Sequence, residues 1–107
     1  MNPFARLELM VGAEGMARLR AARVTVVGLG AVGSYTTEAL ARAGVGQLCL
    51  IDGDVIQPSN LNRQLYALHS TVGRPKAKIA AERVRDINPS CQVDARHLFV
   101  DRDSLPN

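Results

Sequence analysis

Short apolar runs and longer segments with helical spacing follow one another along the chain. The run at residues 23–27 is β-branched with almost no polar residue, which is typical of a strand buried on both faces of a parallel sheet, and the apolar run at residues 47–51 predicts a second strand. Residues 92–100 alternate loosely between apolar and polar and predict a third strand. Apolar spacing of three or four residues, or richness in Ala and Leu, predicts helices over residues 13–22, 31–43 and 76–87. This order predicts an α/β fold with a Rossmann-like parallel sheet and flanking helices.

Glycine, asparagine and proline mark the ends of several of these elements. Gly44 follows the second helix and suits the left-handed position just past a helix end. Asn88 and Pro89 end the third helix. A polar loop follows the second strand, and residues 61–69 after it favour a short helix. Residues 101–107 are typical of the approach to a further helix.

Composition narrows the class of protein without identifying a ligand. The chain has 107 residues, 47% of them hydrophobic and 21% charged, as in a soluble globular domain. Its net charge of +3 is compatible with a polyanion such as ATP or RNA, although no basic stripe or aromatic platform is visible. There is no CxxC pair for a metal, no apolar run long enough for a bilayer and no signal peptide, so we expect a cytoplasmic protein without protein-held metal in this segment.

The motif "GLGAVG" joins the first predicted strand to the second helix. Gly28, Gly30 and Gly33 stand where a strand-to-helix turn needs them, for the turn, for phosphate approach and for close helix packing. The N–H groups at the helix start would bind an anionic phosphate, helped by the helix dipole. The motif predicts nucleotide binding, and glycines used only for packing are the alternative.

Two carboxylates follow the second strand in "IDGD". Asp52 lies 19 residues beyond Gly33, where an acidic residue can accept hydrogen bonds from ribose hydroxyls. This spacing fits the adenosine of ATP and that of NAD equally well. Asp52 can also be a turn residue before Gly53, and Asp54 is either a neighbour of the nucleotide or a plain surface residue.

The stretches "NLNRQ" and "GRPKAK" add polar and cationic groups that a hydride-transfer site does not need. Asn60 and Arg63 lie in the first, and Lys76 begins the third helix, where its charge opposes the helix dipole. A bound triphosphate would offset that repulsion. Arg63 and Lys76 are therefore candidate catalytic residues that stabilise a departing pyrophosphate, and two solvated surface cations are the alternative.

Four segments in order resemble the ThiF-type family of ATP-dependent adenylating enzymes, which includes sulfur-carrier activators of molybdopterin and thiamine synthesis and ubiquitin-activating enzymes. The segments are "GLGAVGSYTTEALARAGVG", "LIDGDVIQPSNLNRQ", "VGRPKAK" and "INP". Within the family, "FARLELMVGAEGM", "GAVGS" and "NRQLYALHSTVGRPK" are most similar to the branch that dehydrates threonylcarbamoyladenosine in tRNA.

The resemblance implies an enzyme that uses ATP and Mg²⁺ to adenylate a carboxylate and expel pyrophosphate, with tRNA as substrate. It implies that the three loop glycines line the phosphates, that Asp52 holds the ribose with Asp54 nearby, and that Asn60, Arg63 and Lys76 contact the triphosphate. Arg6 resembles an arginine that reaches into the nucleotide site of the partner in a homodimer. A sulfur-transfer protein is a further possible partner.

We expect residues 1–107 to form the N-terminal part of a single nucleotide-binding domain, truncated after about three strands where such sheets have about five or six. By the resemblance, the magnesium-binding aspartate lies beyond residue 107, so this chain alone is expected to be inactive. The alternatives are a sulfur-carrier-protein adenylyltransferase, an NAD-binding oxidoreductase and an inactive nucleotide-binding fragment.

Overall fold

The computed structural model describes residues 4–99. The three strands form one parallel sheet in the order β1-β2-β3, which confirms the predicted Rossmann-like fold. Leu48 of the central strand pairs with Val24 on one side and Val93 on the other. In chain order the elements are α1 (Ala5–Ala21), β1 (Arg23–Val27), α2 (Ala31–Arg42), β2 (Gln47–Ile51), the 3₁₀ helix η1 (Pro58–Asn62), α3 (Lys76–Ile87) and β3 (Gln92–Arg96).

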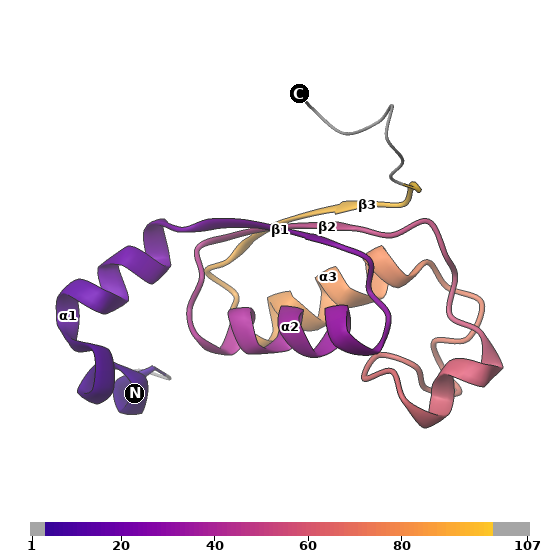
Figure 1. Ribbon diagram of the computed structural model, residues 1–107, viewed down its shortest axis with the longest axis horizontal. Coiled ribbons are helices and arrows are strands. Elements are labelled where there is room, and N and C mark those ends of the chain that lie inside the picture. The colour runs from indigo at the N-terminus through magenta and orange to yellow at the C-terminus, as the bar shows by residue number, and fades with distance from the viewer. Residues whose placement is uncertain (1–3, 100–107) are drawn as a thin grey trace.

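Helices α2 and α3 lie side by side against one face of the sheet (Figure 1). Leu50 of β2, Ala41 of α2, and Ala80 and Val84 of α3 are fully buried there. Removing these apolar side chains from water stabilises the layer by roughly 25 cal/mol for each Å² buried. The core between sheet and helices therefore fixes where the strand ends and helix starts lie.

The prediction that the first strand is buried on both faces is wrong for the part of the chain that the structure describes. Alternate residues of β1 are exposed, and Val27 is 54% exposed to solvent. Thr25 pairs in register with Cys49, and Cys49 with Asp94. Side chains alternate across a strand, so these mixed polar residues share the face opposite α2 and α3. That face of the sheet therefore carries polar side chains, which would not fit a core with helices packed on both faces of the sheet.

Several predicted element ends differ from the structure. Helix α1 begins well before residue 13, and Gly12 interrupts it with a φ of 76°. The predicted helix at residues 61–69 is wrong, since only η1 forms and turns follow it. Strand β3 ends at Arg96. Residues 100–107, which include the end of the predicted strand and the predicted approach to a helix, lie outside the described residues.

Other boundaries agree closely with the sequence. Helix α2 ends at Arg42, and Gly44 takes the left-handed conformation with a φ of 89°. Helix α3 spans the predicted residues and ends at Ile87, and the N–H of the following Asn88 donates to Val84 O (2.8 Å).

Candidate nucleotide-binding site

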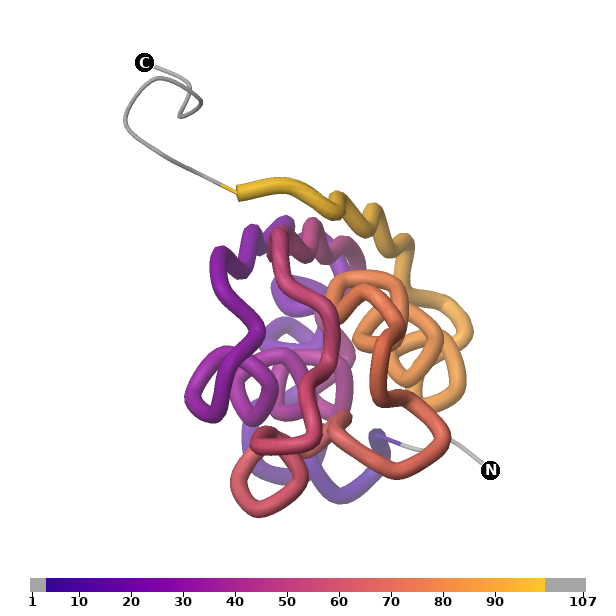
Figure 2. The backbone as a smooth tube through the Cα atoms, turned by 90° about the vertical axis from the view of Figure 1, so that its right-hand side faces the viewer, coloured from indigo at the N-terminus to yellow at the C-terminus, as the bar shows by residue number. Residues whose placement is uncertain are grey.

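The carboxyl ends of β1 and β2 meet at one edge of the sheet, and the candidate residues other than Arg6 gather there. The glycine loop follows β1, residues 52–54 follow β2, and the segment from 55 to 75 runs below this edge to the start of α3 (Figures 1 and 2). Ligands of open α/β sheets bind outside the carboxyl ends of the strands. The fold thus places the sequence motifs on the side where a nucleotide would bind.

The three glycines of the loop have three different physical reasons to be glycine. Gly28 has a φ of 88°, which side chains rarely permit, and its N–H donates to Ile51 O (2.9 Å). A β-carbon at Gly33 would lie 1.8 Å from Gly28 O, so helix α2 could not start this close to β1. A β-carbon at Gly30 would meet no atom within 4 Å.

The open space at Gly30 belongs to a hollow of about 520 Å³ that runs along β1 to the first turns of α2. Helix α2 begins at Ala31, and no side chain caps it. The first N–H groups of a helix have no partner within the helix, and the helix dipole favours an anion beside them. The open space at Gly30, the uncapped N–H groups at the start of α2 and the dipole of this helix together suit a phosphate group.

Asp52 connects the end of β2 to the glycine loop. Its Oδ2 accepts a hydrogen bond from the Leu29 N–H (2.7 Å), and its Oδ1 accepts one from the Asp54 N–H (2.7 Å). The residue is 9% exposed. Each carboxylate oxygen can accept a second bond, so this anchoring is compatible with the predicted ribose contact. Leu29 N–H, however, is committed to Asp52 rather than to a phosphate.

Asp54 and Lys76 are brought together through the backbone. The Lys76 N–H donates to Asp54 O (3.1 Å), next to the bridge between Val55 and Pro75. The Asp54 side chain is exposed, whereas Lys76 is only 7% exposed although it carries a charge. Within residues 4–99, the ion pairs join other side chains and none includes Lys76. Among the described residues no buried side-chain nitrogen lacks a hydrogen-bond partner, so Lys76 is not an orphaned buried charge. Its place in the first turn of α3, where the helix dipole repels a cation and none of these carboxylates pairs with it, favours an anion nearby.

Asn60 lies on η1 and Arg63 directly follows it, and the two side chains make different local contacts. Asn60 is buried, and its Oδ1 accepts a hydrogen bond from the Gln57 N–H (2.7 Å), which closes a capping box on η1. Arg63 is exposed, and its Nη1 donates to Ser59 O (2.8 Å) and Asn62 Oδ1 (3.2 Å). The remaining donors of the Arg63 fork are therefore available at the surface.

The structure does not bring Arg6 to the glycine loop of its own chain. Arg6 lies on α1, at the end of the molecule opposite the loop (Figure 1). Its side chain is exposed. This placement leaves the predicted role in a partner's site open.

Sequence reasoning missed Tyr66, a buried residue that joins the segment after η1 to helix α2. Tyr66 is 4% exposed, and its hydroxyl donates to Ser34 O (3.0 Å) in the first turn of α2. The available signal was an aromatic residue in the short apolar run from Leu65 to Leu68, directly after the polar stretch that carries Arg63. Its partner, 32 residues earlier, gave no local signal.

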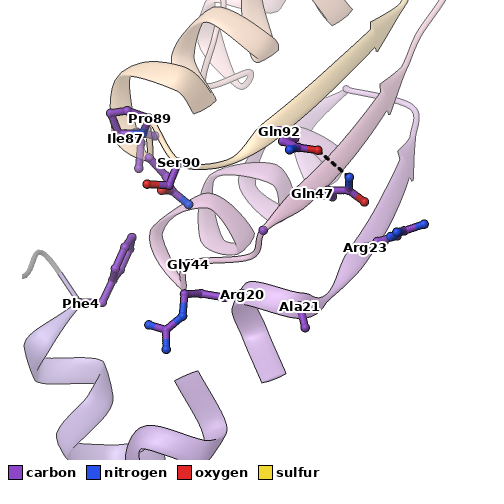
Figure 3. Close-up of a pocket in the computed structure, with 12 residues that line it drawn as sticks. Phe4, Arg20, Ala21, Arg23, Gly44, Gln47, Ile87, Pro89, Ser90 and Gln92 are labelled. Carbon is purple, nitrogen blue, oxygen red and sulfur yellow. Dashed lines mark hydrogen bonds between the residues drawn. The ribbon is translucent and has the colours of Figure 1, made fainter. Parts of the chain in front are cut away.

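A second hollow, of about 650 Å³, opens at the amino ends of the strands. In Figure 3, Phe4 and Arg20 of the α1 region lie on one side of it and Pro89 and Ser90 on the other. Gln47 Nε2 donates to Gln92 Oε1 across its floor (2.7 Å). It is larger than the hollow at the glycine loop, but it contains none of the predicted site residues. The carboxyl edge is therefore the better candidate, because the loop, the carboxylates and the cations converge there.

Residues 4–99 contain no group of three or more His, Cys, Asp or Glu side chains placed to hold a metal ion. A Mg²⁺ ion commonly takes one or two carboxylates and completes its shell with phosphates and water. The exposed Asp54 carboxylate is compatible with that limited role. Across the same residues, no helix is both long and apolar enough to span a membrane.

Comparison with known proteins gives consistent relatives. The chain is 48% identical over 99 residues to a tRNA threonylcarbamoyladenosine dehydratase of Bacillus subtilis, which covers 92% of this chain and 39% of that protein. It is 44% identical over 92 residues to a molybdopterin-synthase adenylyltransferase of Salmonella typhimurium, covering 86% of the chain and 37% of the relative. The chain therefore spans about two fifths of the length of these relatives.

Solved structures agree with the sequence relatives. The crystal structure of Escherichia coli tRNA N6-threonylcarbamoyladenosine dehydratase in complex with ATP matches with a TM-score of 0.92 and 42% identity, over 94% of this chain and 42% of that one. The model of the ThiF family matches residues 4–107. The chain belongs to the ThiF family.

Proposed function

We propose that this chain is the N-terminal, ATP-binding part of an enzyme that adenylates a carboxylate, with threonylcarbamoyladenosine in tRNA as the substrate. The observation that carries the proposal is the convergence of an uncapped glycine-loop helix start with Asp52, Asn60, Arg63 and Lys76 at one sheet edge. The likeness to named tRNA dehydratases supports this choice of substrate.

The roles of the residues follow from their places. Gly28 and Gly33 set the loop, and the open space at Gly30 admits the phosphates. Asp52 holds the ribose with lone pairs not used by Leu29 and Asp54. Lys76 and Arg63 contact the triphosphate, Asn60 shapes the segment that carries Arg63, and Asp54 lies beside the reacting end.

In the proposed reaction, an oxygen of the substrate carboxylate attacks the α-phosphorus of ATP, and the bond from that phosphorus to the pyrophosphate oxygen breaks. Negative charge then develops on the departing pyrophosphate. Preorganised cations stabilise such charge, and this is the task of Arg63 and Lys76 as catalytic residues. Ring closure afterwards displaces AMP, so one water is lost from the modified adenosine in total.

A Mg²⁺ ion would be held chiefly by the ATP phosphates, with Asp54 the available carboxylate among the described residues. When bound, the ion would neutralise phosphate charge. The further magnesium-binding aspartate that the family resemblance implies would come from sequence beyond residue 107.

We also propose a cytoplasmic homodimer in which Arg6 of each chain enters the partner's nucleotide site. Leu9 and Met10, close to Arg6 on α1, are 88% and 85% exposed. Apolar side chains at such exposure suit a protein contact. A sulfur-transfer protein is a further proposed partner, in line with relatives named for sulfur-carrier activation.

The second candidate function is adenylation of a sulfur-carrier protein, which the 44% identity to a molybdopterin-synthase adenylyltransferase favours. An NAD-binding oxidoreductase shares the glycine loop but leaves Arg63 and Lys76 without a task. The remaining alternative, an inactive nucleotide-binding fragment, would bind the nucleotide but would not catalyse adenylation.

Pyrophosphate release separates the two adenylation substrates. We expect the intact enzyme to release pyrophosphate from ATP when threonylcarbamoyladenosine-containing tRNA is added, and not with unmodified tRNA. Release only with a carrier protein that ends in a free carboxylate would select the second candidate. For the chain itself, a larger melting shift with ATP than with AMP or NAD supports the adenylating site, and a larger shift with NAD would contradict it.

A further inference from the structure

Tyr66 links the segment that carries Arg63 to the helix that starts at the glycine loop. Its hydroxyl donates to Ser34 O (3.0 Å), and the Ser34 N–H donates to Gly30 O (2.9 Å). The tyrosine hydroxyl is therefore two hydrogen bonds away from the loop glycine that leaves room for a phosphate. Ser34 itself is fully buried, so this link lies in the interior and not on the surface.

The Tyr66 ring and backbone are held from several sides. Thr71 Oγ1 donates to Tyr66 O (2.7 Å), and Thr71 is 8% exposed. The guanidinium carbon of Arg83 lies 5.8 Å from the centre of the Tyr66 ring. Arg83 is fixed in turn, since its Nε and Nη2 donate to both carboxylate oxygens of Glu38 (2.5 and 3.0 Å). Helix α2 and helix α3 thus both restrain the ring.

The hydroxyl remains a donor over the ordinary pH range. Burial raises the pKa of Tyr66 to about 12, while the neighbouring Thr37 hydroxyl lowers it by a smaller amount. Because the phenol stays protonated, the bond to Ser34 O does not depend on pH near neutrality.

The backbone carries the restraint from Tyr66 back to the predicted triphosphate residues. The Ala67 N–H donates to Gln64 O (3.0 Å), and the Gln64 N–H donates to Asn60 O (2.9 Å). Arg63, whose own N–H also donates to Asn60 O (3.1 Å), sits inside this series of turns. A shift of Tyr66 against α2 would therefore move Asn60 and Arg63 against the glycine loop.

We propose that Tyr66 is a positioning residue that sets the placement of Arg63 relative to the glycine loop and so favours binding of the triphosphate over that of AMP. The inference rests on the proposed function, since it assigns Arg63 to the triphosphate. Tyr66 contacts no phosphate itself and acts through the turns that it anchors.

The test is Tyr66→Phe, which removes one hydroxyl and keeps the ring, alone and combined with Arg63→Ala. Isothermal titration of the chain with ATP and with AMP gives the two affinities. We expect Tyr66→Phe to weaken ATP binding about threefold to tenfold, the loss typical of one hydrogen bond, and to change AMP binding less than about twofold. In the Arg63→Ala background, Tyr66→Phe should have no further effect on ATP binding.

Tyr35→Phe is the matched control, because Tyr35 lies on α2 beside Ser34 and is 58% exposed. It should leave both affinities unchanged. If Tyr66→Phe does not fold, Thr71→Val removes the bonds of Thr71 Oγ1 to Tyr66 O and to Leu68, which loosens the same turns, and it should give the same ATP-selective loss.

Equal losses for ATP and AMP, or a Tyr66→Phe effect that adds in full to that of Arg63→Ala, would show a purely structural role and overturn the inference. In both of those results the unsubstituted chain still binds ATP, so the proposed function stands. No ATP binding by the unsubstituted chain would overturn the proposed function and the inference with it.

Discussion

The carboxylate of Asp52 and the backbone N–H of Leu29 are joined by a buried hydrogen bond of 2.7 Å, which ties the end of β2 to the glycine loop after β1. Asp52 is thus an anchor of the loop in addition to the predicted ribose ligand. Hydrogen bonds to charged groups contribute more than neutral ones, about 1.5–3 kcal/mol. Anchoring the loop uses the carboxylate to accept bonds from backbone N–H groups, whereas ribose binding uses it to accept bonds from hydroxyls.

Asp52→Asn tests the anchoring role. The amide keeps one acceptor oxygen, so one of the two N–H groups now bound by the carboxylate loses its partner. We expect the free energy of unfolding to fall by about 1–3 kcal/mol in chemical denaturation. Asp54→Asn is the control for stability, since the Asp54 side chain is exposed and should change it by less than about 0.5 kcal/mol. Equal effects of the two substitutions would contradict the anchor.

Two substitutions in the glycine loop should separate phosphate binding from packing. Gly30→Val should abolish ATP binding in isothermal titration while the chain stays folded, because no atom lies within 4 Å of the added β-carbon and the φ of Gly30 is −74°. Gly33→Ala should instead unfold or severely destabilise the chain, because its β-carbon would meet Gly28 O at 1.8 Å. Unchanged ATP affinity in Gly30→Val would mean that the loop serves packing alone.

The elements that the sequence predicted well are those whose signals are local. The apolar spacing of α3 and the left-handed Gly44 after α2 depend on neighbours within a few residues. The helix expected at residues 61–69 failed because Thr71 accepts and donates bonds at Leu68 and holds the chain in turns instead. A side chain ten residues after the start of the segment decided its conformation.

Predictions about the site also succeeded where topology or local signals decided the outcome and failed where distant residues did. Parallel strands bring their carboxyl ends to one edge, so the nearness of Asp52 to the glycine loop followed from topology. Which atoms Asp52 binds did not follow, because Leu29 is 23 residues away in sequence. The open sheet face at Thr25 and Cys49 was also missed, since an apolar run does not tell how many helices will cover it.

Lys76→Ala should lower the rate of the chemical step much more than it lowers the stability of the fold. Removing a cation from the first turn of α3 relieves its repulsion with the helix dipole, so the free energy of unfolding should not fall by more than the loss of side-chain packing. In the intact enzyme, pyrophosphate release should nevertheless fall by about 2–4 kcal/mol of transition-state stabilisation, and Arg63→Ala should do the same. Near-normal release by both variants would remove Arg63 and Lys76 from the proposed mechanism.

The Glu38–Arg83 pair should make stability depend on pH in the acid range. Hydrogen bonds from Arg83, and secondarily from Arg42, hold the pKa of Glu38 below its ordinary 4.5, against the opposing effect of burial. Because the folded-state pKa is lowered, the stabilisation is fully present above about pH 4.5 and is lost as the pH falls through the folded value. Glu38→Gln should therefore cost about 1 kcal/mol near neutral pH and nothing at lower pH.

Thermal unfolding of the unsubstituted chain and of Glu38→Gln, from pH 7 to pH 3, measures that difference in stability. Glu14→Gln is the control, because the Glu14–Arg18 pair is exposed on both sides and should contribute almost nothing at any pH. A Glu38→Gln deficit that stays constant down to pH 3 would show that packing, and not ionisation, accounts for it.

Self-association through the outer edge of β1 is the last expectation. In the described residues β1 and β3 are the two outer strands, and exposed apolar side chains lie beside β1, with Val27 at 54% and Val32 at 81% exposure. Unpaired strand edges next to apolar surface pair with other chains unless a charge blocks them. We expect the chain to form species larger than the proposed dimer at micromolar concentration in light scattering, and Val32→Lys to remove these larger species. A monodisperse monomer or dimer without the substitution would mean that the edge of β1 is protected in solution.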